Sequence, residues 1–271
     1  MIDTYLPAVI LGVVQGLTEF IPVSSSGHLV IAHQLLGNNE LGSTFDAVLH
    51  LATLLAILIY FRSDWLQMLT AWIHPARRRA TRLNRRLLGY IALATLPALV
   101  FGWFGISWVD THFRSLIAVA LLMIVLGVVF LLATRFIKSI NDLSRLTWSK
   151  ALAIGLAQAL AILPGISRSG ATIVVGMYAG LRRELAARFS FLLAAPIIAG
   201  AGFYSLYQSF QQGDWLSGQY VFWLVAFAAS LISGLLAIQF LMQFLKNHSL
   251  QIFAYYLLVV GAGVLVYNFF V

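Results

Sequence analysis

The chain has 271 residues, of which 61% are hydrophobic and only 10% are charged, and its mean hydropathy is +0.91. Soluble domains carry about 25% charged residues, so this composition excludes a soluble fold, because its polar side chains are too few to cover a surface that faces water. The formal net charge of +8 comes largely from arginines gathered between apolar segments. That pattern is typical of the cytoplasmic loops of membrane proteins, and we do not interpret it as nucleic-acid binding. The chain has no cysteine, which excludes disulfides and thiolate chemistry.

Long apolar segments follow one another through the chain and predict an all-α polytopic membrane protein, a helix bundle that forms a single integral membrane domain over residues 1–271. Strict alternation of polar and apolar residues is absent, so the pattern does not fit a closed β-barrel. A short apolar segment at 65–74 is expected to lie at the membrane interface. The longer segments are 6–36 (interrupted), 45–62, 87–107, 115–136, 148–181 (interrupted), 184–209, 219–245 and 251–270.

The basic residues predict how these segments cross the membrane. Six arginines lie just before the segment 87–107 and are expected to form a cytoplasmic loop, namely Arg77, Arg78, Arg79, Arg82, Arg85 and Arg86. With that loop inside, the other Lys and Arg residues also fall inside, except Arg114 outside and Arg168 within the membrane. The segments 6–36 and 148–181 then each begin and end on one face. We therefore expect two re-entrant hairpins, each a broken helix, that enter from opposite sides.

The two hairpins resemble each other in sequence. A shift of 143 positions brings six identical residues together, since Gly12, Gln15, Leu17, Ser24, Ser26 and Gly27 fall on Gly155, Gln158, Leu160, Ser167, Ser169 and Gly170. Each hairpin is followed by a full span, so we predict an inverted repeat with copies at about 6–107 and about 148–245. Transporter folds of this type place their site where broken helices meet near the midplane.

Two polar breaks inside the hairpins carry the candidate site. The first break, Pro22-Val23-Ser24-Ser25-Ser26-Gly27-His28, follows Glu19, and the second, Pro164-Gly165-Ile166-Ser167-Arg168-Ser169-Gly170, contains Arg168. A charge at membrane depth costs about 3 kcal/mol, so the Glu19 carboxylate needs Arg168, a metal ion or a proton beside it. The guanidinium of Arg168 presents a fork of donors that matches phosphate. We expect it to bind an anion, with a salt bridge to Glu19 as the alternative role.

Small polar residues surround these charges. Ser25 and His28 are candidates for the nucleophile or the proton-transfer group, whereas His33 and His50 are interpreted as packing or hydrogen-bonding residues. A structural role as helix N-caps is the alternative for the serines. The candidate phosphate ligands lie at the starts of two half-helices, where backbone N–H groups and the helix dipole favour an anion: Ser24, Ser26, Gly27, Ser167, Ser169, Gly170 and Thr172.

This combination of groups predicts the handling of a phosphate or pyrophosphate. Glu19 can act as a general base or can ligate a divalent ion that bridges phosphate oxygens, and Gln15, one helical turn earlier, faces the same side. Because the polar groups lie in a membrane, we expect a lipid-linked phosphate whose tail stays in the bilayer. A flippase or transporter of such a lipid is the alternative, since inverted repeats serve alternating access.

The breaks resemble the signatures of a known family. Three sequences look like those of the bacterial undecaprenyl-pyrophosphate phosphatases, also called bacitracin-resistance proteins: Gln15-Gly16-Leu17-Thr18-Glu19-Phe20-Ile21-Pro22-Val23-Ser24-Ser25-Ser26-Gly27-His28, Pro164-Gly165-Ile166-Ser167-Arg168-Ser169-Gly170-Ala171-Thr172 and Phe189-Ser190-Phe191-Leu192-Leu193-Ala194-Ala195-Pro196. The resemblance covers essentially the whole chain. It implies a multi-pass enzyme of the bacterial inner membrane that converts undecaprenyl pyrophosphate to undecaprenyl phosphate and phosphate. This reaction recycles the lipid carrier for wall polymers and confers bacitracin resistance.

The resemblance also implies a divalent cation, Mg²⁺ or Ca²⁺, and an active site that opens to the periplasm. Carried onto this chain, the acidic motif falls on Gln15 and Glu19, the nucleophile or proton-transfer group on Ser25 and His28, and the phosphate clamp on Arg168. Many members have glutamate in place of Gln15, and since a neutral amide is a weaker metal ligand, Glu19 should carry the acid–base or metal role. The expected partners are the lipid substrate and membrane lipids, not nucleic acid, and a homodimer is compatible with the sequence.

Overall fold

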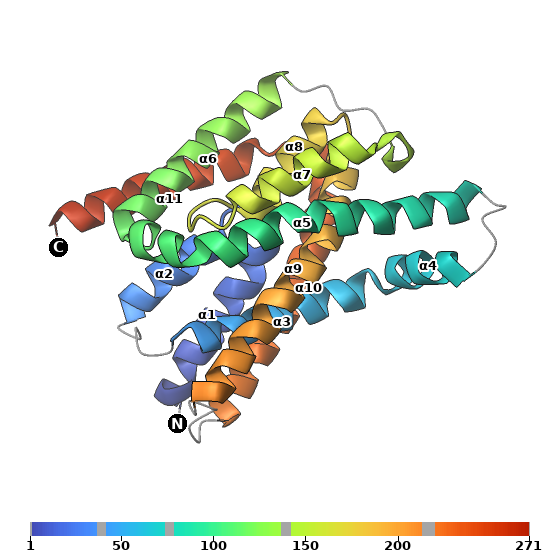
Figure 1. Ribbon diagram of the computed structural model, residues 1–271. Helices are drawn as coiled ribbons and strands as arrows, with labels where there is room; N and C mark the ends of the chain where they lie inside the picture. The colour runs from blue at the N-terminus through green and yellow to red at the C-terminus, as the bar shows by residue number, and fades with distance from the viewer. Residues whose placement is uncertain (1, 37–41, 74–78, 137–141, 213–219, 271) are drawn as a thin grey trace.

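The computed structural model of the chain describes residues 2–36, 42–73, 79–136, 142–212 and 220–270 (Figure 1). These residues form helices and connections, and no strand occurs among them. The helices are α1 (Ile2–Phe20), α2 (Ser25–Leu36), α3 (Gly42–Tyr60), α4 (Arg62–Ile73), α5 (Arg79–Phe113), α6 (Leu116–Phe136), the 3₁₀ turn η2 (Leu143–Arg145), α7 (Trp148–Leu160), α8 (Arg168–Tyr178), α9 (Arg183–Gln212), α10 (Tyr220–Asn247) and α11 (Gln251–Phe270).

Five helices of the described chain are long and apolar enough to cross a membrane, namely parts or all of α5, α6, α9, α10 and α11. A sixth span is formed if α3 and α4 are counted together, although the chain bends by 72° between them. The predicted interfacial segment 65–74 falls largely on α4, beyond that bend. The prediction of an all-α, multi-pass membrane protein is therefore confirmed.

The first turns of α5 correct one prediction. We expected a loop of arginines followed by a span from residue 87, but α5 already begins at Arg79 and runs for 35 residues, about 52 Å. Arg79, Arg82, Arg85 and Arg86 therefore lie on a helix, whereas the residues 77–78 lie outside the described part of the chain. Arginine is a good helix former, so a polar run of this kind can continue a membrane helix beyond the apolar region instead of ending it.

Three of the helices around the predicted breaks are too short to cross a bilayer. The helices α2, α7 and α8 have 12, 13 and 11 residues, which correspond to about 17–20 Å, whereas the hydrocarbon core is about 30 Å thick. Both breaks contain a residue with positive φ, Ser24 at 74° and Gly165 at 102°. At Gly165 the chain also passes close to α6, because an added Cβ would lie 2.6 Å from Val119 O. The two breaks thus interrupt helices at the predicted positions.

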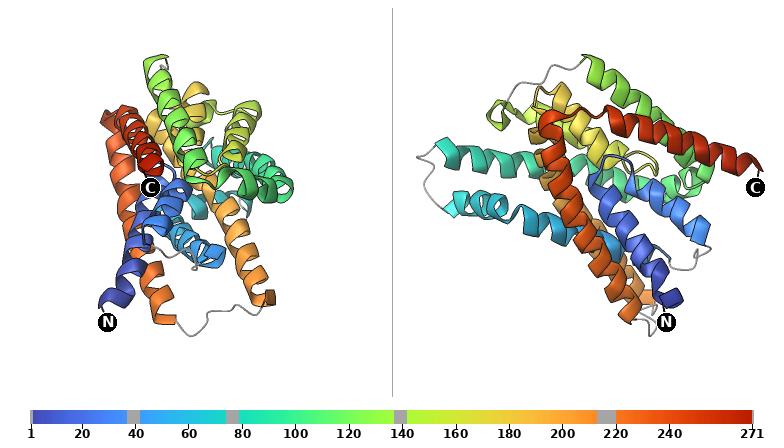
Figure 2. Two further views of the ribbon diagram at one scale, coloured as in Figure 1. Left: turned by 90° about the vertical axis from the view of Figure 1, so that its left-hand side faces the viewer. Right: turned by 180° about the vertical axis from the view of Figure 1, so that it is seen from behind.

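The helices before the two breaks pack against long helices from the other half of the chain. Helix α1 packs along α10, and α7 packs along α5. Glycines make both contacts close, since an added Cβ would lie 2.4 Å from Ala226 O at Gly12 and 2.3 Å from Ala94 O at Gly155. Close approach through small residues is the usual way in which membrane helices associate. Helices α3 and α9 pack together between these pairs, and α6 lies beside α11 (Figure 2).

We predict that Gly155→Ala destabilises the protein although alanine is the better helix former. The new methyl group would collide with backbone atoms of Ala94, which cannot rotate away, so α5 and α7 must separate, at a cost of about 1–3 kcal/mol. The melting temperature in detergent should fall. Gly200→Ala on α9 is the control, since no atom lies within 4 Å of its added Cβ, and equal melting temperatures for the two variants would contradict the prediction.

Candidate functional site

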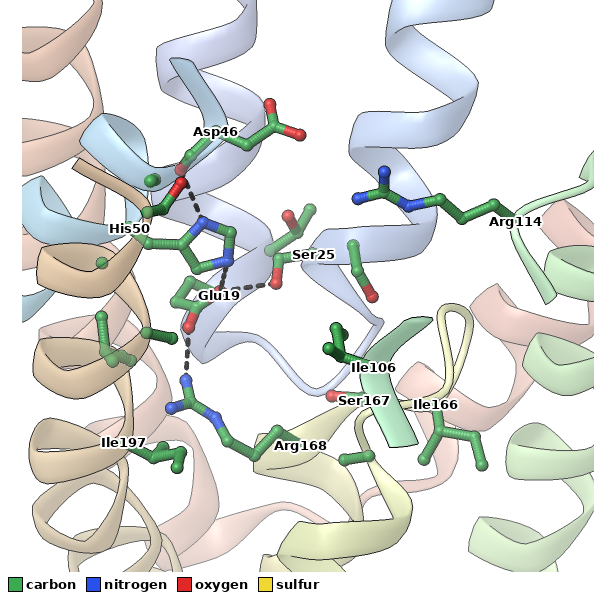
Figure 3. Close-up of a pocket in the computed structure, with 18 residues that line it drawn as sticks. Glu19, Ser25, Asp46, His50, Ile106, Arg114, Ile166, Ser167, Arg168 and Ile197 are labelled. Carbon is green, nitrogen blue, oxygen red and sulfur yellow. Dashed lines mark hydrogen bonds and ion pairs between the residues drawn. The ribbon is translucent and has the colours of Figure 1, made fainter. Parts of the chain in front are cut away.

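A pocket of about 340 Å³ lies where the two breaks meet, and its lining comes from both hairpins and from α3, α5 and α9 (Figure 3). Glu19 and Arg168 point toward each other in its interior, and Asp46 and Arg114 lie on the side away from Arg168. The residues that line it are Thr18, Glu19, Ser25, Ser26, Asp46, Ala47, His50, Ile106, Arg114, Ala161, Ile166, Ser167, Arg168, Ile197, Ile198, Ala201, Gly202 and Ser205.

The Glu19 carboxylate, on the last turn of α1, collects donors from three directions. Arg168 Nη2, at the start of α8, donates to Oε1 across the gap between the hairpins. Ser25 Oγ donates to Oε2 over 2.5 Å, and Gln15 Nε2 donates to the same oxygen over 3.0 Å. Glu19 is only 5% exposed, so these donors replace the water that its charge has lost. The structure therefore brings together the predicted acid, the predicted guanidinium and one predicted hydroxyl.

This ion pair is costly to break. Both charges have left water, and their attraction repays that loss only while both partners are present. Removing one partner of such a pair typically costs about 3–5 kcal/mol, because the other charge stays buried alone. Arg168 Nη1 also donates to Ala194 O over 3.4 Å, so α9 helps to orient the guanidinium. An anion that enters the pocket meets a guanidinium already aimed at it.

His50 is the site residue that the sequence analysis missed. It lies on α3, lines the pocket, and places Nε2 3.7 Å from Glu19 Oε2. Its Nδ1 lies 2.7 Å from the backbone oxygen of Asp46, and since a carbonyl only accepts, Nδ1 carries the hydrogen. Nε2 is therefore the ring nitrogen that faces Glu19. A detectable signal was present, because Asp46 and His50 lie one helical turn apart within an otherwise apolar segment.

His28 is not brought to the pocket. Its Nε2 lies 2.8 Å from Tyr256 Oη, its Nδ1 lies 2.8 Å from Ser24 O, and its ring stacks on that of Tyr256. Both ring nitrogens therefore have partners on α11 and in the first break, outside the pocket lining. In this geometry His28 holds α2 against α11, and Ser25, not His28, faces Glu19.

The predicted phosphate ligands divide into two groups. Ser26 and Ser167 line the pocket, together with Ser25 and Arg168. Ser24, Ser169 and Thr172 make internal contacts, which fits the alternative structural role: Ser24 caps α2 by accepting from Gly27 N, Ser169 pairs with Ser167, and Thr172 donates to Arg168 O and pairs with Ser190. Ser167 belongs to both groups, because it also caps α8 by accepting from Gly170 N.

The two glycines of this set lie where a side chain would be crowded, slightly at Gly27 and severely at Gly170. An added Cβ at Gly27 would lie 3.2 Å from a methyl group of Val119 and 3.4 Å from Gly165 Cα, so the two breaks touch each other here. At Gly170 it would lie 2.4 Å from the ring of Phe130. Both glycines therefore let the breaks pack against α6, which carries Val119 and Phe130.

A divalent cation fits this site only together with a phosphate. Within the described ranges, no cluster of three His, Cys, Asp or Glu side chains is placed to hold a metal ion. Gln15 Oε1, however, is buried beside Glu19 and has no hydrogen-bond partner among the described residues. Mg²⁺ commonly binds through one or two carboxylates, waters and substrate phosphates. One carboxylate and one amide oxygen therefore suit a cation that a bound phosphate helps to hold.

Comparison with known proteins identifies the family. Residues 8–263 match the family described as bacitracin resistance protein BacA. The chain belongs to this family. A relative from Rubrobacter xylanophilus, named undecaprenyl-diphosphatase, is 43% identical over 255 residues that cover 93% of each chain. Relatives with the same name from Mycobacterium sp. (strain KMS) and Desulforudis audaxviator are 40% and 41% identical, over 97% and 95% of this chain and 96% and 95% of their own lengths. The family expected from the two breaks is thereby confirmed.

We predict that Gln15→Glu strengthens cation binding beside Glu19. A second carboxylate beside Glu19 adds a full negative charge, and a pair of unit charges at 4 Å interacts by about 1–4 kcal/mol in water or near a protein surface. The dissociation constant for Mn²⁺, measured by electron paramagnetic resonance with methylenediphosphonate present, should fall on the order of tenfold, or about 1.4 kcal/mol. Gln67→Glu, which adds the same charge on α4 away from the pocket, should leave it unchanged, and equal constants in both variants would refute the assignment.

Proposed function

We propose that the protein is an undecaprenyl-diphosphate phosphatase of a bacterial inner membrane. It removes the terminal phosphate of undecaprenyl pyrophosphate and leaves undecaprenyl phosphate, which recycles the carrier of cell-wall precursors and underlies bacitracin resistance. The observation that carries the proposal is the contact of Glu19 with both Arg168 and Ser25 in one pocket of a membrane protein. Its family membership and the name of its relatives supply the substrate.

Binding of the pyrophosphate is assigned to Arg168. In the substrate-free geometry its guanidinium donates to Glu19 and Ala194, and a phosphate oxygen that enters between them competes for the same donors. A guanidinium and a phosphate form a bidentate, charge-assisted contact. The charge that spreads over the phosphate oxygens during transfer then lies against a fixed cation in a site with little water, where such stabilisation is largest.

We assign the nucleophile to Ser25, one of the two candidates, Ser25 and His28, that the sequence left open. Ser25 Oγ already donates to Glu19 over 2.5 Å, within the distance at which a base can take its proton. Ser25 Oγ attacks the terminal phosphorus while Glu19 accepts the proton, and the bond from that phosphorus to the bridging oxygen breaks. Undecaprenyl phosphate leaves with that oxygen. Water then attacks the phosphorus of the phosphoserine, the bond from that phosphorus to Ser25 Oγ breaks, and the proton of the water passes through Glu19 to Ser25 Oγ, which restores the serine and releases phosphate.

His50 is assigned to proton transfer. His50 Nε2 lies 3.7 Å from Glu19 Oε2, so this nitrogen is placed to take the proton that Glu19 receives, pass it to water and return the carboxylate to its basic form before the hydrolytic step. His28, held against Tyr256, acts as a positioning residue for the start of α2, where Ser25 lies.

A divalent cation, Mg²⁺ or Ca²⁺, would be held by Glu19 and the amide oxygen of Gln15 together with the phosphates. When bound, it supplies positive charge to the phosphate oxygens. The side chains described above still bind the headgroup, hold it and move the proton.

We further propose that the two halves of the chain form an inverted repeat with re-entrant hairpins. The support is that the first helix of each hairpin packs on a long helix from the other half of the chain. Helix α1 of the first hairpin packs on α10 of the second half, and α7 of the second hairpin packs on α5 of the first half. The caps are equivalent as well, since Ser24 and Ser167 accept from glycines three residues later, and each pairs with the serine two residues later. Half-helices that enter from opposite faces bring their tips together without crossing the membrane.

The site is proposed to open to the periplasmic side. Ile106 near the end of α5 and Arg114 just beyond it line the pocket, whereas Arg79, Arg82 and Arg86 lie at the beginning of the same helix. About 36 Å of helix separates Arg82 from Ile106, which is more than the thickness of the hydrocarbon core. If the arginines lie in the cytoplasm, the pocket faces the other side.

We predict that Arg168→Ala lowers phosphate release from undecaprenyl pyrophosphate by at least about 10²–10³-fold, whereas Arg168→Lys retains part of the rate because it keeps the charge and loses the fork. The assay uses purified protein in detergent, where a transporter has no second compartment to move its lipid to. Arg183→Ala, which removes an arginine outside the pocket, is the control, and melting temperatures show that the variants fold. Full phosphate release by Arg168→Ala, or none by the unaltered protein, would overturn the proposal.

We predict that Ser25→Ala abolishes turnover, whereas Ser26→Ala, which also removes a pocket hydroxyl, retains most of it, because Ser25 alone of the two donates to Glu19. Rapid acid quenching of the unaltered protein with substrate labelled at the terminal phosphate should trap label on the protein as a phosphoserine, which survives acid. A phosphohistidine is lost in acid and kept in alkali. If the label is stable only in alkali, the nucleophile is a histidine and the assignment of Ser25 is wrong.

A further inference from the structure

A second hollow lies at the opposite end of α5 from the catalytic pocket, and we call it the arginine pocket. It has a volume of about 710 Å³ and is formed by the first turns of α5, by η2 and by the start of α9. Its lining is dominated by arginines and leucines, with one aspartate: Arg79, Ala80, Arg82, Leu83, Arg86, Asp142, Leu143, Ser144, Arg182, Leu185 and Arg188. The proposed chemistry uses none of these residues.

Positive charge in the arginine pocket exceeds what nearby acids neutralise. Arg182 pairs with Asp142 and Glu184, and Arg188 pairs with Asp64. Among the described residues, five arginines of the lining stand against one acid in the lining and two just outside it, which leaves an excess of two positive charges in this part of the structure. Within the described ranges, no hydrogen bond or ion pair involves Arg79 or Arg86, and both side chains are exposed.

The arginine pocket lies where two candidate membrane spans begin, at Arg79 and Arg183. The ends of membrane spans are expected at the level of the lipid headgroups. The nearby Trp148 is 54% exposed at the start of α7 and packs its edge on Tyr90, and tryptophan is enriched at the level of lipid headgroups. Figures 1 and 2 place this end of α5 on the far side of the bundle from both chain termini. A ligand here meets guanidinium groups and the edge of the bilayer together.

These features together point to one class of ligand. Guanidinium groups bind phosphate oxygens through paired donors, and basic hollows between membrane helices on the cytoplasmic side suit anionic lipid headgroups. The leucines of the lining, Leu83, Leu143 and Leu185, can contact the glycerol and the first carbons of the acyl chains. We propose that the arginine pocket binds the headgroup of an anionic phospholipid with two phosphodiester groups, of the diphosphatidylglycerol class, whose two charges match the two unneutralised arginines.

The test measures binding, so it does not depend on the proposed activity. Delipidated full-length protein in neutral detergent is titrated with diphosphatidylglycerol, with phosphatidylcholine and with inorganic phosphate, and its melting temperature is followed. A ligand that binds only the folded protein raises that temperature with concentration. Diphosphatidylglycerol should raise it, and phosphatidylcholine should not. An equal rise with inorganic phosphate would overturn the assignment to a lipid and leave a soluble anion as the ligand.

Variants separate the arginine pocket from general surface charge. The pair Arg79→Gln and Arg86→Gln should lose the rise, whereas the matched pair Arg62→Gln and Lys246→Gln, which removes two cations predicted on the same face but outside the pocket, should keep it. If both pairs lose the rise in melting temperature equally, or if neither pair loses it, the site is refuted.

The unaltered protein offers a measurement that needs no variant. A photoreactive diphosphatidylglycerol should label peptides from 79–88, 142–146 or 182–188, and labelling confined to other helices would also refute the site.

Discussion

The structure of the site depends on one ion pair, between Glu19 and Arg168. The two residues are 149 positions apart in the chain and lie at different helix breaks, and neither charge is tolerable alone once it is buried. The pair therefore requires both hairpin tips to be in contact. It contributes little net stability, because desolvation offsets most of the attraction. Its consequence is specificity: only the arrangement that brings the two breaks together leaves neither charge buried alone.

Close packing allows the tips to meet. Gly12 and Gly155 bring α1 against α10 and α7 against α5, and Gly27 lets the first break touch Gly165 of the second. Serine caps then end each break at the start of a half-helix. Many of the glycines and serines that the sequence suggests as phosphate ligands serve instead to pack helices closely or to cap them. The groups left facing the pocket are few, and Glu19, Ser25, His50 and Arg168 are the ones whose chemistry suits phosphoryl transfer.

Helix α5 connects the two ends of the molecule. Its last turns and the residue that follows them contribute to the catalytic pocket, and its first turns carry three of the five arginines of the arginine pocket. A hydropathy profile begins the span near residue 87, because the arginines before it are strongly hydrophilic. It does not show that the helix already begins at Arg79, although arginine is a good helix former. In the proposed orientation the extension carries positive charge to the level of the headgroups, and such charge is the feature that orients a membrane protein.

The sequence by itself determined the membrane class, the positions of both breaks, the family and the need of a buried acid for a partner such as the guanidinium, because burial cost and helix breaking are local properties of residues such as Glu19, Pro22 and Arg168. It did not determine which histidine faces the acid. His28 lies three residues from Ser25, yet the rotation of α2 directs it to Tyr256, whereas His50, far along the chain, reaches Glu19 because α3 packs beside α1. The direction of a side chain depends on how its helix is rotated against neighbours distant in sequence, and only the tertiary structure decides that.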